Sequence, residues 1–339
     1  MHMRKWFVST LATAVAVAAF APAQAASIDS IVFFGDSLSD TGNIWYATTG
    51  FPPPPYNQGT SGAGPDRTGG QWSDYLGPSW PSVFAAKFGL LATPSIVGGN
   101  NFAWGGARTG VNAAPGGAPW LDQQVGQYLA GRAALPDAMP LSAEAMSSAI
   151  DTRLYSVMIG GNDVANKLGD PVALANGVQS IVTALTNLYG AGGRQFLVAN
   201  VPDIGETPEF QGREAALPGI TAFASAWTLQ WNVALETALG SLALPGASIG
   251  FLDLYGLGKD PLLLAGFANT TDACLTSAGV CPDPTQYFYW DSFHPTSRTH
   301  ASIADYAARA VGVPEPASLA LMLLGLGGPA AARRRCARR

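Results

Sequence analysis

Two segments far apart in the sequence carry the residue types of nucleophilic acyl transfer. Ser37 lies in a Gly-Asp-Ser-Leu segment that directly follows the apolar run 31–34, and Asp291 precedes His294 by three residues. A serine hydroxyl is a weak nucleophile at neutral pH and needs a positioned base. A histidine serves best as that base when a carboxylate fixes its tautomer and stabilises the imidazolium. The two segments therefore predict a Ser37 nucleophile, a His294 general base and an Asp291 partner.

Two further segments offer hydrogen-bond donors for a developing negative charge. Residues 100–107 (Asn-Asn-Phe-Ala-Trp-Gly-Gly-Ala) follow the expected second strand, and residues 160–163 (Gly-Gly-Asn-Asp) end the expected third strand. The amide of Ser37, a glycine N–H and the side chain of Asn162 are suited to bind a tetrahedral oxyanion. Losing one such donor typically lowers the rate by about 10² to 10³.

The alternation of apolar runs and helical patterns indicates how these segments are positioned. The run 31–34 is continuously apolar, as is typical of a parallel strand buried on both faces, and similar runs occupy 155–159, 196–199 and 249–252. Helical patterns occupy 171–188, 220–239 and 297–310. This alternation predicts a three-layer α/β/α domain with a parallel sheet. Ligands bind at the carboxyl edge of such a sheet, where Ser37 is expected.

Residues 50–77 interrupt the alternation, because they are rich in Pro, Gly and Ser and contain four consecutive prolines at 52–55. Five tryptophans fall in or near this segment and its sequel: Trp45, Trp72, Trp80, Trp104 and Trp120. Long aromatic loops commonly line a site in α/β enzymes. Tryptophans beneath long loops also form cores, so the sequence leaves both interpretations open.

The four segments, in this order and at these strand ends, resemble the GDSL (SGNH) family of lipases and esterases. The resemblance extends over about residues 28–311, and we expect the domain to span 27–312. It implies a flavodoxin-like fold with a parallel sheet of about five strands, and a triad of Ser37, Asp291 and His294. It also implies oxyanion donors on Ser37, Gly106 and Asn162, with Gly105 open as an alternative to Gly106. No cofactor or metal is implied.

Other candidate residues are expected to have structural roles. Ser248 lies in a Gly-x-Ser-x-Gly pattern, but the nucleophile elbow with that pattern requires a strand before the serine, whereas here the apolar run follows it. His300, in the first turns of the last expected helix, is predicted to be a structural histidine. Asp36 and Asp163 are predicted to hydrogen-bond the turns beside them.

Residues 1–25 have the pattern of a secretory signal peptide. Arg4 and Lys5 precede an apolar run at 11–20, and Ala-Gln-Ala at 23–25 fits a signal-peptidase site. The run is too short for a membrane-spanning helix. The sequence therefore predicts export, with signal peptidase as a processing partner.

Residues 313–339 combine a Pro-Glu-Pro motif, an apolar run at 317–332 and five arginines. As a helix, at roughly 1.5 Å per residue, the run would span about 24 Å, less than a hydrocarbon core of about 30 Å. A permanent anchor is one interpretation. The order of features instead resembles the PEP-CTERM sorting signal of Gram-negative bacteria, which implies recognition by an exosortase and transient association with the inner membrane. The expected destination is the cell surface, the outer membrane or the extracellular matrix.

The charge of the domain limits the classes of molecule that it is expected to bind. Outside the leader and tail, 11 of the 18 basic residues and 22 of the 23 acidic residues remain. A domain with this acidic excess is not expected to bind nucleic acid electrostatically.

Cys274 and Cys281 are close in sequence and would meet an oxidising periplasm, which predicts a small-loop disulfide. Outside the leader only His294 and His300 remain as histidines, so a metal site built on histidine is not expected.

These observations predict an exported serine hydrolase of carboxylic esters that forms an acyl-enzyme on Ser37. Its substrate is expected to be an acyl lipid or an acylated polysaccharide, and a deacetylase of extracellular polysaccharide is therefore an alternative to a lipase. A non-catalytic surface or biofilm matrix protein on a hydrolase scaffold is a third hypothesis, because a fold does not dictate a function.

Overall fold

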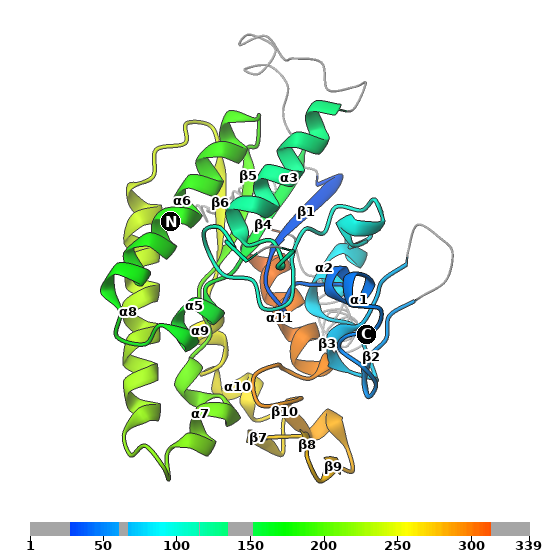
Figure 1. The fold of residues 1–339 in the computed structure, drawn as a ribbon, viewed down its shortest axis with the longest axis vertical. Coiled ribbons are helices and arrows are strands. Elements are labelled where there is room, and N and C mark those ends of the chain that lie inside the picture. The colour runs from blue at the N-terminus through cyan, green and yellow to red at the C-terminus, as the bar shows by residue number, and fades with distance from the viewer. Residues whose placement is uncertain (1–27, 61–66, 115, 135–151, 313–339) are drawn as a thin grey trace, which may run out of the picture.

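A four-stranded parallel sheet forms the centre of the molecule. The computed structural model describes residues 28–60, 67–114, 116–134 and 152–312, so the expected leader at 1–25 and tail at 313–339 lie outside the described residues. The strand order is β1-β4-β5-β6, and every pairing is parallel (Figure 1). The four strands are β1 (Ser30–Gly35), β4 (Arg153–Met158), β5 (Gln195–Ala199) and β6 (Ser248–Leu252).

Helices cover both faces of this sheet. The longer ones are α2 (Trp80–Ala86), α3 (Leu121–Ala134), α6 (Pro171–Gly190), α8 (Ile220–Ser241) and α11 (Ser297–Ala310). The shorter helices are α1 (Asn43–Thr48), α5 (Gly161–Asn166), α7 (Pro208–Arg213), α9 (Leu254–Leu257) and α10 (Pro261–Leu264), with 3₁₀ turns η1 (Ser95–Val97), η2 (Ile204–Glu206) and η3 (Pro284–Gln286). Among the described residues, no helix combines the length and apolar character needed to cross a bilayer.

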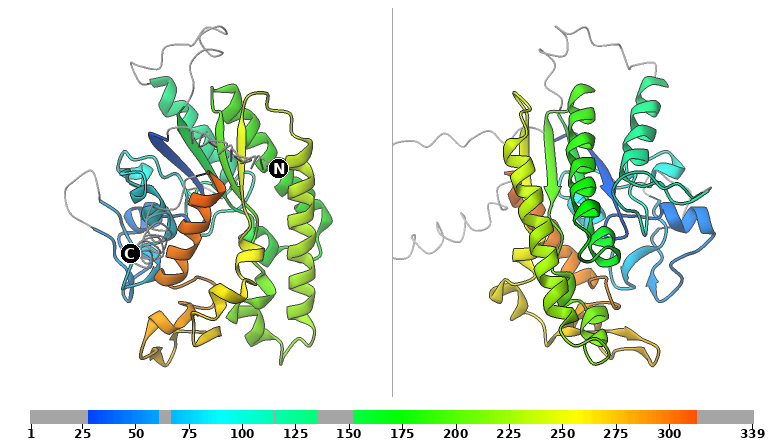
Figure 2. Two further views of the ribbon diagram at one scale, coloured as in Figure 1. Left: turned by 180° about the vertical axis from the view of Figure 1, so that it is seen from behind. Right: turned by 60° about the vertical axis from the view of Figure 1, so that its left-hand side comes forward.

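The central strands are apolar because both of their faces are buried. Along β1, Val32 and Phe34 pack into a core with α3, α6 and α8, whereas Ile31 and Phe33 pack into a second core with α2 and α11. Successive side chains of a strand point to opposite faces, so a strand between two helical layers must be apolar throughout. The three-layer α/β/α prediction is confirmed, and Figure 2 shows α11 on the opposite side of the sheet from α6.

In the part of the chain that is described, the sheet has four strands, against an expectation of about five. The residues that precede the 100–107 segment form the 3₁₀ turn η1, followed by Gly98 and Gly99. On the edge of β1 away from β4, residues 100–104 run parallel to the strand, with an isolated bridge between Phe33 and Asn101. The Phe102 N–H donates to the Phe33 carbonyl at 2.7 Å and the Trp104 N–H to the Gly35 carbonyl at 3.1 Å, so this segment lies along β1 without forming a regular strand.

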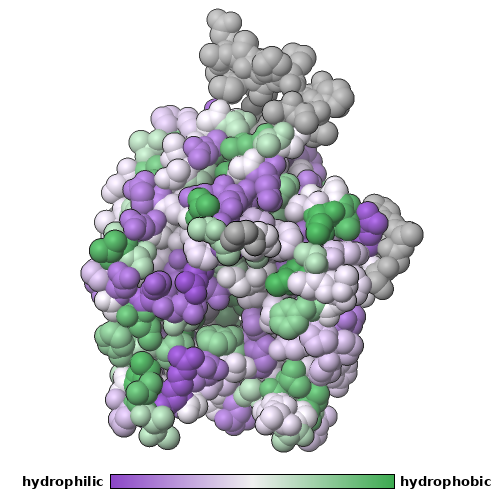
Figure 3. All heavy atoms as spheres, viewed as in Figure 1, coloured by the Kyte–Doolittle hydropathy of each residue, from purple (hydrophilic) through white to green (hydrophobic). Residues whose placement is uncertain are grey.

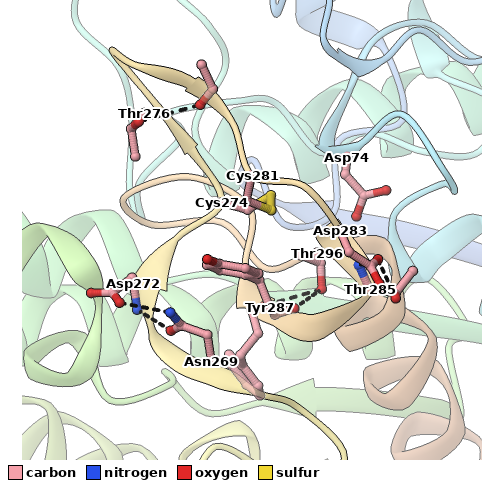
Figure 4. Close-up of a disulfide and its surroundings, with 12 residues drawn as sticks. Asp74, Asn269, Asp272, Cys274, Thr276, Cys281, Asp283, Thr285, Tyr287 and Thr296 are labelled. Carbon is pink, nitrogen blue, oxygen red and sulfur yellow. Dashed lines mark hydrogen bonds between the residues drawn. A yellow bond between two sulfur atoms is a disulfide. The ribbon is translucent and has the colours of Figure 1, made fainter.

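A group of short strands surrounds the loops beyond the sheet. Pairs form between β2 (Tyr56–Asn57) and β3 (Gln71–Asp74), between β7 (Asn269–Ala273) and β10 (Tyr287–Tyr289), and between β8 (Leu275–Thr276) and β9 (Gly279–Val280). A disulfide joins Cys274 to Cys281 within the last of these regions (Figure 4). The backbone beside it is tied to the segment that precedes the Asp-Ser-Phe-His sequence, because the Leu275 N–H donates to the carbonyl of Trp290.

Removing this disulfide is expected to lower stability. By the loop-closure model, a cross-link that spans a short loop contributes about 2 kcal/mol. The double variant Cys274→Ser/Cys281→Ser should therefore unfold about 5 °C below the wild type in a calorimetric scan. A reductant should lower the melting temperature of the wild type and leave that of the variant unchanged. Equal melting temperatures for the oxidised wild type and the variant would show that the cross-link contributes nothing.

Candidate active site

The carboxyl edge of the sheet gathers segments from four parts of the chain. Ser37 follows β1, and Asn162 lies in the first turn of α5, which follows β4. Gly106 comes from the loop after the bridge at Asn101, and His294 from the loop after β10. All four line one cavity. Because parallel strands end on the same side, residues distant in sequence meet there.

Ser37, His294 and Asp291 form a continuous hydrogen-bonded chain. The Ser37 Oγ lies 2.8 Å from His294 Nε2, and His294 Nδ1 lies 2.7 Å from Asp291 Oδ2. A carboxylate only accepts, so Nδ1 carries the proton and donates it to Asp291. Nε2 is thereby left as an acceptor facing the serine hydroxyl. This arrangement meets the geometric requirement for general-base activation of a serine.

The carboxylate of Asp291 is held by four donors. The backbone N–H groups of Phe293 and His294 each donate to Oδ1 at 2.7 Å, and the Tyr56 hydroxyl donates to Oδ2 at 2.7 Å beside the imidazole. Burial alone would raise the pKa of Asp291, but the charge of His294 and these hydrogen bonds lower it to about 2. The group is therefore an anion throughout the neutral range. Tyr56 was not among the predicted site residues, because nothing in its local sequence indicates a partner 235 residues away.

The ring of Trp72 packs against the imidazole ring of His294. The two rings lie 4.6 Å apart, centroid to centroid, at an interplanar angle of 31°. The edges of Phe51 and Tyr56 pack against Trp72 in turn, with centroids 5.3 and 5.8 Å away. These contacts restrict rotation of the imidazole away from Ser37. The proline-rich segment thus brings an aromatic wall to the site.

Two backbone amides and one side-chain amide lie in the cavity beside the Ser37 hydroxyl. Within the described residues, the N–H groups of Ser37 and Gly106 have no hydrogen-bond acceptor, and both residues line the cavity. The Asn162 Nδ2 donates one hydrogen to the carbonyl of Ala107 at 2.9 Å, which leaves its second hydrogen available. Such a set of preorganised donors is suited to an oxyanion.

A buried carboxylate distinguishes Gly106 from its neighbour. The Gly105 N–H donates to Asp40 Oδ2 at 2.8 Å and is therefore occupied. Asp40 also accepts from three backbone N–H groups at 42–44, which fixes the turn after Ser37. Burial raises the pKa of Asp40 to about 6 against the effect of these bonds. Gly106 adopts a φ of 75°, a conformation that favours glycine, and its N–H has no acceptor among the described residues.

A comparison of the sequence with family models agrees with this geometry. The model described as GDSL-like Lipase/Acylhydrolase matches residues 31–307. The chain belongs to the GDSL-like lipase/acylhydrolase family. It is accordingly a carboxylic ester hydrolase of the GDSL esterase/lipase type.

Relatives of this GDSL hydrolase occur in plants, fungi and bacteria. A GDSL esterase/lipase of Arabidopsis thaliana is 25% identical over 87% of this chain and 93% of its own length. A phosphatidylcholine-sterol acyltransferase of Aeromonas hydrophila is 26% identical over 95% of this chain and 89% of its own length. An acetylesterase of Thermothelomyces thermophilus is 33% identical but covers only 52% of this chain and 55% of its own length.

The rival residues of this GDSL hydrolase lie elsewhere. Ser248 is exposed at the first position of β6, at the amino end of the strand and so at the opposite edge of the sheet from Ser37. His300 is fully buried in α11, where Nε2 lies 3.3 Å from the Trp72 carbonyl. Burial lowers the pKa of His300 to about 3, so the ring is neutral.

The two aspartates beside the site residues make structural hydrogen bonds. Asp36 accepts from the Leu38 N–H at 3.0 Å, across the turn that contains Ser37, and burial raises its pKa to about 7. Asp163 accepts from the N–H and the hydroxyl of Thr109, and so ties the Gly106 loop to α5.

The tryptophans divide between the two interpretations left open by the sequence. Trp72 lines the cavity, whereas Trp80 is fully buried in the core under α2. Trp45, Trp104 and Trp120 are partly buried and are not among the residues that line the cavity.

The Asn162 side chain offers a direct test of the oxyanion site of this GDSL hydrolase. Replacement by alanine is expected to lower kcat by about 10² to 10³, because a donor to the developing charge is lost. KM for a p-nitrophenyl ester should change little, since the effect belongs to the transition state. As a control, Asn166→Ala removes an amide one turn later, which bonds the Asn162 carbonyl at 2.8 Å, and should retain most activity. A loss confined to KM in Asn162→Ala would contradict this role.

Proposed function

We propose that the chain is an exported serine esterase that transfers the acyl group of a carboxylic ester to water through an acyl-enzyme on Ser37. The single observation that carries this proposal is the His294 ring, which lies between the Ser37 hydroxyl at 2.8 Å and the Asp291 carboxylate at 2.7 Å. This is the contact order that base-assisted attack by serine requires.

In the first half-reaction, Ser37 Oγ attacks the ester carbonyl carbon while His294 Nε2 takes the hydroxyl proton. The tetrahedral oxyanion is bound by the amides of Ser37 and Gly106 and by the side chain of Asn162. When the intermediate collapses, the bond to the alcohol oxygen breaks and His294 returns the proton to it. Water, deprotonated by the same ring, then attacks the acyl carbon. The bond to Ser37 Oγ breaks and His294 returns the proton to Oγ, which releases the acid and restores the serine.

The export part of the proposal rests on the sequence. The leader pattern at 1–25 and the Pro-Glu-Pro, apolar and arginine-rich order at 313–339 support secretion and exosortase sorting in a Gram-negative envelope. A disulfide between Cys274 and Cys281 suits an oxidising compartment. Detection of the protein in periplasmic, outer-membrane or extracellular fractions, and of a mature form shortened at both ends, would test this part.

A serine-directed fluorophosphonate probe tests the chemical part. The purified protein should be labelled on Ser37 and should hydrolyse p-nitrophenyl butyrate, and labelling should block hydrolysis. A folded protein that neither reacts with the probe nor hydrolyses the ester would instead support a non-catalytic matrix protein.

A further inference from the structure

The cavity beside Ser37 continues along the carboxyl edge of the sheet. It has a volume of about 380 Å³ and reaches from Ser37 past the ends of β4 and β5 to α9, where Leu254 and Leu257 line it. In the sheet order β1-β4-β5-β6, Ser37 follows the first strand and α9 follows the last. Three strand spacings of about 4.8 Å separate these ends, or roughly 14 Å. Figure 3 shows a hollow near the middle of one face, bordered by both hydrophilic and hydrophobic residues.

One wall of the cavity is apolar. Five buried side chains contribute to it, each 7% exposed or less: Met158, Leu254, Leu257, Phe288 and Ile303. They belong to the core that packs α11 against the sheet. Because they are held by that core, they form a preorganised surface that a flexible apolar ligand can cover without reordering the protein.

Polar side chains in the same wall are already occupied by the protein. The Asn200 side chain donates to Asp253 at 2.7 Å and accepts from the Leu254 N–H at 2.6 Å. Asp203 accepts from Lys259 at 2.8 Å. These groups are therefore poor partners for sugar hydroxyls, and an acetyl group at Ser37 would leave the apolar wall in contact with water.

We propose that this cavity binds the acyl chain of a medium- to long-chain ester, with Leu257 at the end remote from Ser37. The substrate class is then a lipid acyl ester, and acetylated polysaccharide is excluded as the preferred substrate. This inference rests on the acyl-enzyme proposed above, because Ser37 defines the end of the cavity where the ester carbonyl lies.

A series of p-nitrophenyl esters from acetate through butyrate to octanoate tests the proposal. Each methylene removed from water changes binding by about fourfold. The purified wild type should therefore show kcat/KM rising along the series, by at least about tenfold from acetate to octanoate. A wild type that prefers acetate would overturn the proposal and favour a deacetylase.

The variant Leu257→Trp places a large ring at the remote end of the cavity. The ratio of kcat/KM for octanoate to that for acetate should fall by about tenfold or more. The matched control is Leu262→Trp, the same exchange on an 86% exposed leucine of α10, where the ratio should equal that of the wild type. An unchanged ratio in a folded Leu257→Trp protein would overturn the proposal.

A second variant keeps the test decisive if the tryptophan prevents folding. Leu257→Ala enlarges the cavity and should move the optimum towards dodecanoate, and an unmoved optimum would count against the assignment of Leu257. Failure of the mechanism itself has a different signature, because Ser37→Ala would then retain activity on every ester of the series.

Discussion

Replacing Ser37 by alanine is expected to lower kcat/KM for p-nitrophenyl butyrate by about 10⁴-fold or more. The oxygen that would attack the carbonyl is removed, so His294 has no hydroxyl to deprotonate and no acyl-enzyme forms. Donors for the oxyanion remain in place, and they support only a small residual rate above that in water. The measurement is initial hydrolysis rate at several substrate concentrations, with the variant prepared free of wild-type enzyme.

Two controls accompany this variant. Ser248→Ala changes the serine of the competing Gly-x-Ser-x-Gly pattern, which is exposed at the amino end of β6, and should keep wild-type activity. Circular dichroism of Ser37→Ala should match that of the wild type, since only one hydroxyl is lost. Near-normal turnover by Ser37→Ala would end the assignment of the nucleophile.

The two histidines are expected to respond very differently to replacement by alanine. His294→Ala removes the ring that bridges Ser37 and Asp291, and should lower kcat by about 10⁴-fold. His300→Ala should stay within about tenfold of the wild type, because its ring contacts the backbone carbonyl of Trp72 and makes no hydrogen bond to Ser37.

The expected effects on stability are reversed: His300→Ala should lower the melting temperature more than His294→Ala does. His300 is fully buried, so its truncation leaves a cavity and should lower the melting temperature by several degrees. His294 lines an open site, and its loss should affect melting less. A His300→Ala protein that is stably folded and inactive would contradict the assigned roles, since a buried ring with no hydrogen bond to Ser37 would then control the chemistry.

Much of the architecture could be predicted because it is encoded locally. The buried strands appear as apolar runs, and the predicted helix at 297–310 coincides with α11. The runs at 155–159 and 196–199 coincide within two residues with β4 and β5. The segment at 100–104, which runs along β1, has no continuous apolar run that would predict its place, because its position depends on backbone hydrogen bonds to a strand about 70 residues earlier.

The candidate site likewise contains residues that short sequence segments predict and residues whose roles depend on tertiary contacts. Ser37, Asp291, His294 and Asn162 could be proposed from sequence because each lies in a short segment typical of its chemistry. Tyr56 and Trp72 could not, because a tyrosine hydroxyl and a tryptophan ring acquire their roles only when the proline-rich segment folds against the loop around His294.

The sequence by itself determined the residue types that do chemistry, their order along the chain and the strand ends on which they stand, because short segments and apolar periodicity specify these directly. Only the tertiary structure decided that Gly106 and not Gly105 has a free amide, that the His300 ring contacts the Trp72 carbonyl, and how far the cavity extends towards α9. The physical reason is that each of these depends on contacts between groups distant in sequence. The Asp40 carboxylate, for example, accepts a hydrogen bond from the Gly105 N–H, although the two residues are 65 positions apart in the sequence.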